Sequence, residues 1–350
     1  MATQGASEVT ALDLLRFTDG LVVHQALFAA ANLGVADLLK EGARSAADLA
    51  ASLHVNADAL YRTLRFLAGQ GVFYETAART FVNSPLSEWL RADVAGSIRS
   101  ILIYRGGPNY YGPFAELLSS IKTGAPVREK TGAASVFEHL QQNPRDACIF
   151  DDAMTDLSMI WGASVAGAYD FGRWGSLMDI GGGSGLLLAT ILKAHLGLRG
   201  VLVDRPDVLE RARQREFWSS DIAGRARFEP ADFFQSVPSG CRAYLMKNVI
   251  HDWDDERARR ILMNCRRAIS DDGVLLVVEY CLGDDNRPTM GKTIDMLMLT
   301  LTGGRERTLA EHGALLASAG FRMERSIPVT DEVTILEARP VTEEGNRLGD

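Results

Sequence analysis

A glycine-rich segment in the middle of the chain, Asp179–Gly185, limits the possible folds most strongly. It reads Asp-Ile-Gly-Gly-Gly-Ser-Gly, follows Ser176-Leu177-Met178 and precedes an apolar run over 186–192. This order predicts a buried strand, a tight turn and a helix, which together form a cradle for a ligand. Because glycine has no Cβ atom, a ligand can lie directly on such a backbone.

The details of this turn exclude two common nucleotide cradles. No Gly-Lys-Ser/Thr follows, so the segment is not a phosphate-binding P-loop. The dinucleotide fingerprint that starts at Gly181 needs glycine or alanine at 186, and the one that starts at Gly183 needs it at 188. Leucine occupies both Leu186 and Leu188.

Acidic residues end the next two predicted strands. Asp204 follows Val201-Leu202-Val203, where a carboxylate can accept both hydroxyls of a ribose, and Asp232 is followed by Phe233. The pair at 232–233 offers an acceptor for an amine and an aromatic face for a flat ring. This set favours S-adenosylmethionine (SAM), with S-adenosylhomocysteine as its product, over NAD. The alternative for both aspartates is an ordinary cap of the following segment.

Composition fits an enzyme of the cytoplasm. The net charge is −8 with a pI near 5.4, which gives no general attraction for nucleic acid. The most apolar stretch, 21–39, is interrupted by polar residues, so no membrane span is expected. The N-terminus lacks the form of a signal peptide. The cysteines fit neither a zinc site nor a disulfide framework, and are Cys148, Cys241, Cys265 and Cys281.

The alternation of predicted strands and helices from residue 175 indicates an α/β fold with a Rossmann-like parallel sheet. Two further strands, 321–327 and 333–338, have no helix between them and predict an antiparallel C-terminal hairpin. We therefore expect four segments: a helical winged-helix domain over 1–100, a helical linker and pocket segment over 101–172, a ligand-binding catalytic domain over 173–341 and a disordered tail over 342–350.

The N-terminal domain combines a long apolar helix with a winged helix. Residues 10–41 have helical spacing and apolar residues on more than one face, which favours a homodimer contact. Residues 45–83 predict two helices followed by a β wing, a pattern shared with DNA-binding domains. The second helix carries only Arg62 and Arg65 as cations, so we expect scaffold use and no nucleic-acid partner.

Several separated motifs now resemble one family, the class I SAM-dependent O-methyltransferases related to plant caffeic acid and bacterial small-molecule enzymes. The resemblance runs from about residue 20 to 340. Its motifs are the glycine segment, Met246–Trp253 (Met-Lys-Asn-Val-Ile-His-Asp-Trp), Glu279 and Gly303–Thr308. It implies the seven-stranded methyltransferase sheet, a homodimer formed through the N-terminal helices and a small aromatic substrate.

The resemblance also implies residue roles. The catalytic base is His251, held by Glu279 and Glu306. The cofactor contacts are Ser158, Asp179, Gly181, Gly183, Asp204, Asp232, Phe233 and Lys247. The substrate pocket is formed by Phe150, Met154, Trp161, Asp252, Met296, Met298 and Leu299. Leu157 departs from the plant pattern, which has histidine there, and the loop before Gly303 is shorter; both argue against a lignin-type acceptor.

Methyl transfer to a phenol needs removal of a proton whose pKa is about 10 in the free phenol. A histidine near neutral pH is a suitable base, and a carboxylate on its other nitrogen would fix the tautomer. No residue cluster has convincing metal spacing, so no metal is expected. Alternatives are a SAM-binding relative with another reaction (N-methylation, decarboxylation or hydroxylation) and a ligand-sensing winged-helix regulator. His251 could also be a helix-start residue, Glu279 a strand cap and Glu306 an ion partner of a neighbouring arginine.

Overall fold

The computed structural model describes residues 9–130 and 135–341. The tail expected over 342–350 lies outside the described residues. The chain divides into two compact units, Met1–Tyr111 and Gly112–Asp350, and α7 (Pro108–Phe114) crosses this division. The finer domain boundaries expected from the sequence stay predictions. Each unit is described by itself.

The first unit is mainly helical and carries a small antiparallel sheet in the order β1-β3-β2. Ser45 caps α4 by accepting a bond from the Asp48 N–H, and Asn56 caps α5 by accepting one from the Ala59 N–H. The elements are α1 (Ala11–Arg16), η1 (Phe17–Asp19), α2 (Gly20–Leu33), α3 (Val35–Leu38), β1 (Arg44–Ser45), α4 (Ala46–Leu53), α5 (Ala57–Gly69), β2 (Phe73–Ala77), β3 (Thr80–Asn83), η2 (Ser87–Leu90) and α6 (Arg99–Gly106).

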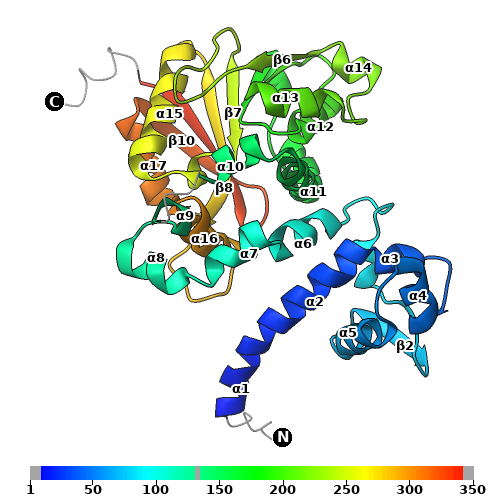
Figure 1. The fold of residues 1–350 in the computed structure, drawn as a ribbon. Helices are drawn as coiled ribbons and strands as arrows, with labels where there is room; N and C mark the ends of the chain where they lie inside the picture. The colour runs from blue at the N-terminus through cyan, green and yellow to red at the C-terminus, as the bar shows by residue number, and fades with distance from the viewer. Residues whose placement is uncertain (1–8, 131–134, 342–350) are drawn as a thin grey trace, which may run out of the picture. The chain divides into compact units, whose positions relative to one another are not determined.

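The second unit is built on a twisted sheet in the order β10-β11-β8-β7-β4-β5-β6, which confirms the predicted fold class (Figure 1). Strands β6, β5, β4, β7 and β8 run parallel, whereas β11 is antiparallel to both β8 and β10. The short β9 pairs with β8 and was not predicted. The strands are β4 (Ser176–Ile180), β5 (Arg199–Asp204), β6 (Ala226–Pro230), β7 (Ala243–Lys247), β8 (Val274–Leu282), β9 (Arg307–Thr308), β10 (Phe321–Pro328) and β11 (Val333–Pro340).

Helices cover this sheet, and α15 and α17 pack together over one face (Figure 1). The helices are α8 (Leu117–Thr123), α9 (Val127–Lys130), α10 (Val136–Gln142), α11 (Pro144–Ala168), η3 (Phe171–Trp174), α12 (Leu186–Ala194), α13 (Pro206–Arg213), α14 (Ser220–Ala223), η4 (Ile250–Asp252), α15 (Asp255–Ala268), α16 (Met290–Leu301) and α17 (Leu309–Ser318). No helix within the described residues is long and apolar enough to cross a membrane.

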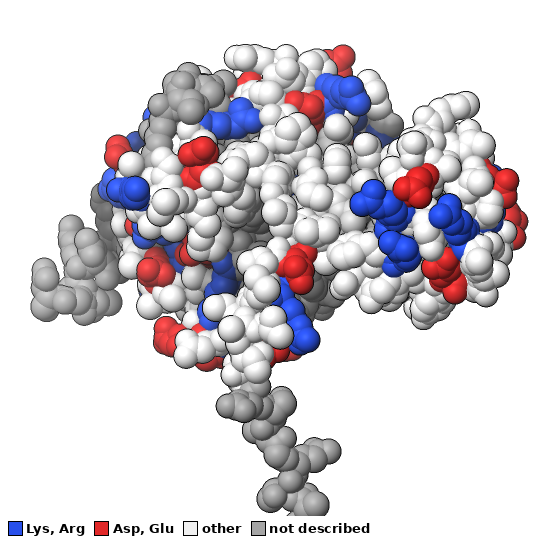
Figure 2. All heavy atoms as spheres, turned by 60° about the horizontal axis from the view of Figure 1, so that its bottom comes forward, with Lys and Arg blue, Asp and Glu red and all other residues white. Residues whose placement is uncertain are grey.

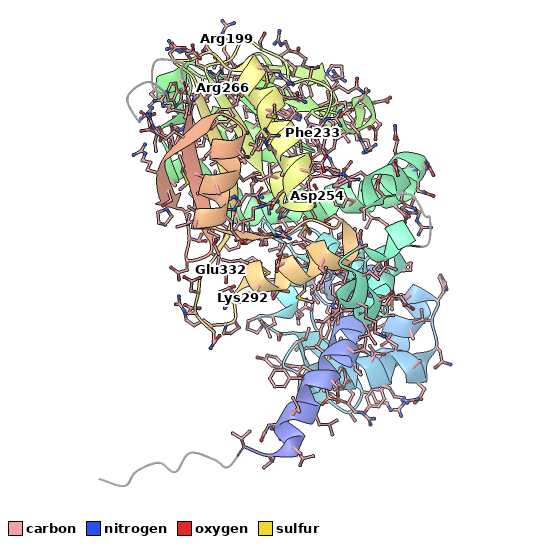
Figure 3. The ribbon with its side chains drawn as sticks, turned by 90° about the vertical axis from the view of Figure 1, so that its left-hand side faces the viewer. Arg199, Phe233, Asp254, Arg266, Lys292 and Glu332 are labelled. Carbon is pink, nitrogen blue, oxygen red and sulfur yellow. The ribbon has the colours of Figure 1, made fainter. Side chains whose placement is uncertain are left out.

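The amphipathic α15 illustrates how the sequence directs this packing. Ala258, Ile261, Leu262 and Cys265 recur at helical spacing and are buried in the main core. Asp254 begins the helix by accepting a bond from the Arg257 N–H, at the position labelled in Figure 3. Most of its polar residues face solvent, whereas Asn264 is buried. On the face drawn in Figure 2, acidic and basic side chains lie interspersed among uncharged ones.

Candidate active site

The glycine loop between β4 and α12 combines a packed side with an open side. A Cβ atom on Gly182 would lie 2.5 Å from Leu202 and 2.6 Å from Asp179 Oδ2, so no larger residue fits. Gly183 has a left-handed φ of 58°, and a Cβ atom there would meet nothing within 4 Å. Gly183 therefore borders open space, where a ligand could approach the backbone.

Asp179 lies beneath this loop and not on its open side. It is 1% exposed, and its Oδ2 has no hydrogen-bond partner among the described residues. Burial, with repulsion from Asp204, raises the pKa of Asp179 to about 7, while Lys247 opposes the rise. Its geometry suits a residue that supports the loop from below.

Asp204 bonds to the glycine loop itself. Its Oδ2 accepts a hydrogen bond from the Gly183 N–H at 2.9 Å, and its Oδ1 accepts one from the Arg205 N–H at 2.8 Å. Burial raises the pKa of Asp204 and these two bonds oppose the rise. Because each carboxylate oxygen has two lone pairs, both oxygens can still accept from a ribose hydroxyl. The bond to Gly183 joins the ends of β4 and β5 in one site.

The segment after β6 contributes an aromatic side chain to the same place. Phe233 Cε1 lies 3.6 Å from the point where a Cβ of Gly181 would stand, and Val249 lies 3.0 Å from it. Phe233 also lies beside α15, where Asn264 donates to its carbonyl oxygen (Figure 3). Asp232 is exposed, and its carboxylate accepts bonds from Phe234 N–H and Gln235 Nε2, so it holds its own turn.

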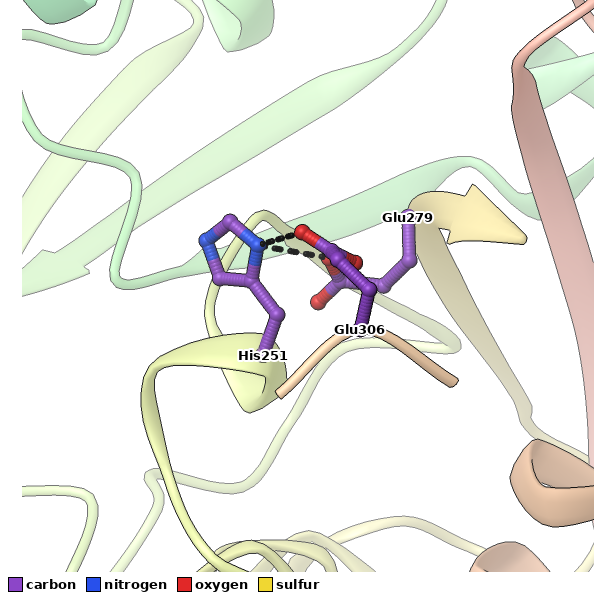
Figure 4. Close-up of side chains that lie close together, drawn as sticks. All are labelled: His251, Glu279 and Glu306. Atoms are coloured by element: carbon purple, nitrogen blue, oxygen red, sulfur yellow. Dashed lines mark hydrogen bonds and ion pairs between the residues drawn. The ribbon is translucent and has the colours of Figure 1, made fainter. Parts of the chain in front are cut away.

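A buried histidine with two glutamates lies after β7. His251 Nδ1 is 2.6 Å from Glu306 Oε1 and 3.6 Å from Glu279 Oε2 (Figure 4). All three residues are buried. On the other side of the ring, Nε2 lies 3.9 Å from Asp252 Oδ1. His251, Glu279 and Glu306 were grouped in the sequence analysis, and the structure brings them together from three distant segments.

Desolvation dominates the titration of the acids around His251. Burial raises the pKa of Glu306 to about 8, and Asp295 raises it further while Arg307 opposes. Burial likewise raises the pKa of Glu279 and of Asp252 to about 7, and the charge of His251 opposes both shifts. Burial thus favours the protonated form of each of these acids. The predicted alternative for Glu306, an ion pair with a neighbouring arginine, is not what its carboxylate forms.

Glu279 is fixed by the turn that carries the histidine. Its Oε1 accepts bonds from the N–H groups of Val249 and Ile250, each at 3.2 Å. Asn248 precedes these residues with a left-handed φ of 54°, which turns the chain after β7. Lys247, at the end of that strand, is half-buried; burial lowers its pKa, and Glu279 and Asp179 oppose this change.

Two features that hold the segment carrying Glu306 in place, at Gly304 and Arg307, were not predicted from the sequence. A Cβ on Gly304 would lie 2.0 Å from the carbonyl oxygen of His251, so only glycine allows the two backbones to touch. Arg307 is 1% exposed and donates to Ile250 O at 3.2 Å, Trp253 O at 2.9 Å and Asp255 Oδ1 at 2.8 Å. The pattern Gly-Gly-Arg-Glu-Arg signals a tight segment, but the partners of Arg307 are far away in sequence.

Helix α11 carries three of the seven predicted pocket residues, Phe150, Met154 and Trp161, and also Ser158. Its half-buried members are Phe150, Met154, Leu157, Ser158 and Trp161. Trp161 Nε1 is a buried donor without a hydrogen-bond partner among the described residues, so it is available to a polar group of a ligand.

Three further predicted pocket residues, Met296, Met298 and Leu299, lie on α16, a helix that was not predicted. Met298 is buried and Met296 is 38% exposed. Two residues of separation in a helix correspond to about 200°, so Met296 and Met298 face different sides. Leu299 shares the side of Met296, three residues away. The three residues therefore do not form one continuous surface.

The histidine cluster also meets the spacing of a metal site. The ligand atoms of His251, Glu279 and Glu306 lie within 4.8 Å of one another. In the structure, His251 and Glu306 are joined by a hydrogen bond. The expected absence of a metal stays a prediction.

Comparison with known proteins now adds to this geometry. Residues 114–322 match the model of an O-methyltransferase domain, and residues 15–93 match that of an O-methyltransferase dimerisation domain. The chain is 37% identical to the phenazine O-methyltransferase PhzM of Lysobacter antibioticus over 328 residues, 94% of this chain and 96% of the relative. It is 36% identical to a mitomycin biosynthesis 6-O-methyltransferase of Streptomyces lavendulae, covering 97% and 96% of the two chains.

Solved structures and a further relative widen this picture. A crystal structure of an O-methyltransferase from neocarzinostatin biosynthesis, in complex with SAM and 2-hydroxy-5-methyl naphthoic acid, superposes with a TM-score of 0.82 at 34% identity, over 96% of this chain and all of that one. The chain is also 32% identical to the 8-amino-8-demethylriboflavin N,N-dimethyltransferase of Streptomyces davaonensis, covering 96% and 97%. Both oxygen and nitrogen acceptors occur among these relatives.

Proposed function

This chain belongs to the O-methyltransferase family, and on that premise we propose that it moves the methyl group of SAM to a phenolic hydroxyl of a small aromatic secondary metabolite, with His251 as general base. SAM-dependent O-methyl transfer is the activity of the family. The base, its partners and the chemical class of the acceptor are the parts that we propose.

The donor side of the site fits SAM. The donor supplies an electrophilic methyl group on a cationic sulfur. We propose that the open backbone at Gly183 and the carboxylate of Asp204 hold it, with Phe233 against its flat ring. Asp179 and Lys247 would act from below the loop and from the end of β7. Asp232 and Ser158 are further proposed contacts.

The observation that carries the proposal is the 2.6 Å hydrogen bond between His251 Nδ1 and Glu306 Oε1. When Glu306 is ionised, Nδ1 donates to it and Nε2 keeps a free lone pair. Nε2 can then accept the proton of an acceptor hydroxyl as the oxygen attacks the methyl group. Glu306 and Glu279 would stabilise the imidazolium that forms. Glu279 itself stays in place through the two backbone N–H groups that it accepts.

The proposed acceptor is a flat hydroxylated aromatic compound. The half-buried Phe150, Met154 and Trp161 on α11 supply apolar surface, and the buried indole N–H of Trp161 can bond to a polar substituent. The relative named as a phenazine O-methyltransferase and the neighbour that contains 2-hydroxy-5-methyl naphthoic acid support this class.

Nitrogen methylation is the second candidate, since one relative is an N,N-dimethyltransferase. Neutral amines are already nucleophilic, whereas a phenol must lose its proton first. A histidine held by a carboxylate is therefore more useful for an oxygen acceptor, and we favour the hydroxyl.

A panel of acceptors tests the proposal. The enzyme would be supplied with SAM that carries a deuterated methyl group, together with hydroxynaphthoic acids, hydroxyphenazines and their amino analogues. We expect the deuterated methyl group to be transferred to the hydroxyl compounds and little of it to the amines. Transfer to amines alone would refute the proposed acceptor class.

The same panel, repeated in excess chelator, tests the predicted independence of metal ions. His251, held by Glu306, can take the proton of a phenol without a cation, so the rate should not change. Loss of turnover in chelator, restored by an added divalent metal, would instead indicate a metal at His251, Glu279 and Glu306.

A further inference from the structure

Helix α11 is tied by polar contacts to both segments that border the donor site. Arg211 Nε on α13 donates to Asp151 Oδ2 at 2.6 Å. One turn further along α11, Thr155 Oγ1 donates to Ser184 Oγ in the glycine loop at 2.9 Å. Arg211 follows β5 in the chain and Ser184 follows β4, so the two contacts join α11 to two different strand ends.

Asp151 is buried and Arg211 is half-buried, so the ion pair between them is expected to add little to stability. The side chain of Asp151 is 8% exposed, and burial raises its pKa although Arg211 opposes the shift. Desolvation of a buried ion pair commonly cancels its attraction, so an apolar pair of similar size would serve stability as well. The helix already packs through small residues, namely Ala147, Ala153, Gly162, Val165 and Ala166. A directional bond adds something else: it fixes the register of the helix.

That register matters for the residues near the pair on α11. Phe150 and Met154 lie within one turn of Asp151, and Ser158 lies two turns away. A rotation or slide of α11 would move all of them against the donor loops. On the other side, Arg211 is also paired with Asp207 at 3.4 Å, and α13 begins two residues after Asp204. The pair thus joins the acceptor helix to the ribose-binding strand end.

We propose that Asp151 and Arg211 are positioning residues, which hold the acceptor helix α11 in register with the donor-binding loops so that acceptor and donor meet at a productive distance. This inference rests on the proposed function, because it takes α11 as the acceptor wall. Neither residue touches a reacting atom; they act through Met154 and its neighbours on the helix.

Kinetics of three variants test the proposal with the best acceptor of the panel. Asp151→Asn and Arg211→Gln should each lower kcat by about 10- to 100-fold, the usual size of a small misplacement, while affinity for SAM stays unchanged. Arg211→Lys keeps the charge and should recover part of the loss. The matched control is Asp272→Asn, which removes an exposed ion pair with Arg242 and should leave kcat unchanged.

The double variant Asp151→Asn/Arg211→Gln separates positioning from folding, and it also serves if a single variant fails to fold. It leaves no unpaired buried charge, so its Tm should recover toward that of the wild type. Positioning requires that its kcat stays low. If kcat recovers together with Tm, the pair is merely structural and the proposal is wrong.

Hydrogen exchange with S-adenosylhomocysteine gives an answer that needs no acceptor. In the wild type, we expect this product to slow amide exchange across residues 150–158. In Asp151→Asn, the protection should disappear although the product still binds. Equal protection in both proteins would overturn the proposal. If the product protects α11 as expected but no panel compound is methylated, the proposed acceptor class fails and the positioning role stands.

Discussion

At the residue scale, His251 illustrates which parts of a site follow from sequence. Its position after a buried strand places it at the carboxyl edge of the sheet, and Glu279 lies in the neighbouring strand β8, one residue beyond the partner of Lys247. Their proximity therefore follows from topology alone. The 2.6 Å contact with Glu306 does not, because it depends on Gly304 touching the His251 backbone. Only the resemblance to a family pointed to Glu306.

Glu306 should make stability depend on pH in a direction opposite to that of ordinary carboxylates. Its pKa is raised from 4.5 to about 8 in the fold, so the folded state binds an extra proton between those values. The free energy of unfolding therefore falls as pH rises through that window, by at most about 1.4 kcal/mol per pH unit for one proton. Glu306→Gln cannot titrate, so it should gain Tm relative to the wild type between about pH 5.5 and pH 8.

Thermal melts at the two pH values measure this difference, with Glu311→Gln as the matched control. Glu311 lies five residues away, and bonds to Thr308 lower its pKa. It is ionised in both states throughout the window, so its loss should shift Tm equally at both pH values. Wild-type and Glu306→Gln melts that shift in parallel would contradict the account of Glu306.

At the element scale, local patterns predicted the long elements and missed those that depend on distant partners. The strands that contain Asp179 and Asp204 and the antiparallel terminal hairpin are confirmed. The two-residue strands β1 and β9 exist only through pairing with β3 and β8, which leaves no local signal. Helix α16 was not predicted, although its buried Ile294, Leu297, Met298 and Leu301 recur at helical spacing.

The turn between β7 and η4 supports a prediction at this scale. Asn248 has a φ of 54°, which asparagine and glycine adopt readily and β-branched residues do not. Asn248→Gly should therefore keep kcat and Tm close to wild type. Asn248→Val should cost about 1–3 kcal/mol of stability and lower kcat, because a strained turn would withdraw the Val249 and Ile250 N–H groups from Glu279. Equal melts and rates for the two variants would contradict this.

At the scale of the whole molecule, the N-terminal segment exposes more apolar surface than a single chain needs. The exposed residues on and around α1, η1 and the start of α2 are Val9, Leu12, Leu14, Leu15, Phe17, Leu21 and Val22. Such a surface indicates a contact with another molecule. The match of residues 15–93 to a dimerisation domain supports a second copy as the partner, as predicted from the apolar helix.

We expect sedimentation analysis to find a homodimer that depends on this surface. Leu15→Glu/Phe17→Glu would place charges in the contact and should shift the equilibrium toward monomer. Leu196→Glu is the control, since Leu196 is also exposed but lies in the second unit. A wild-type protein that stays monomeric, or a dimer unaffected by the double substitution, would contradict the assignment of this surface.

Other properties of the whole molecule could not be predicted from one sequence. In the proposed function, the identity of the acceptor depends on how the side chains of α11 and α16 are arranged. Met296 and Met298 lie on different sides of α16, a helix that was not predicted. The donor, by contrast, followed from the glycine loop and two aspartates. A chain of this family therefore indicates its donor far more clearly than its acceptor.

The most direct test of the central claim is the single-turnover rate of His251→Ala with SAM and a phenolic acceptor, measured beside the affinity for SAM. If His251 is the base, methyl transfer should fall by about 10²–10⁴-fold while SAM binding is kept. His54→Asn, at an exposed histidine in the first unit, controls for loss of a histidine and should behave as wild type. An unchanged rate in His251→Ala, with SAM bound as before, would contradict the account.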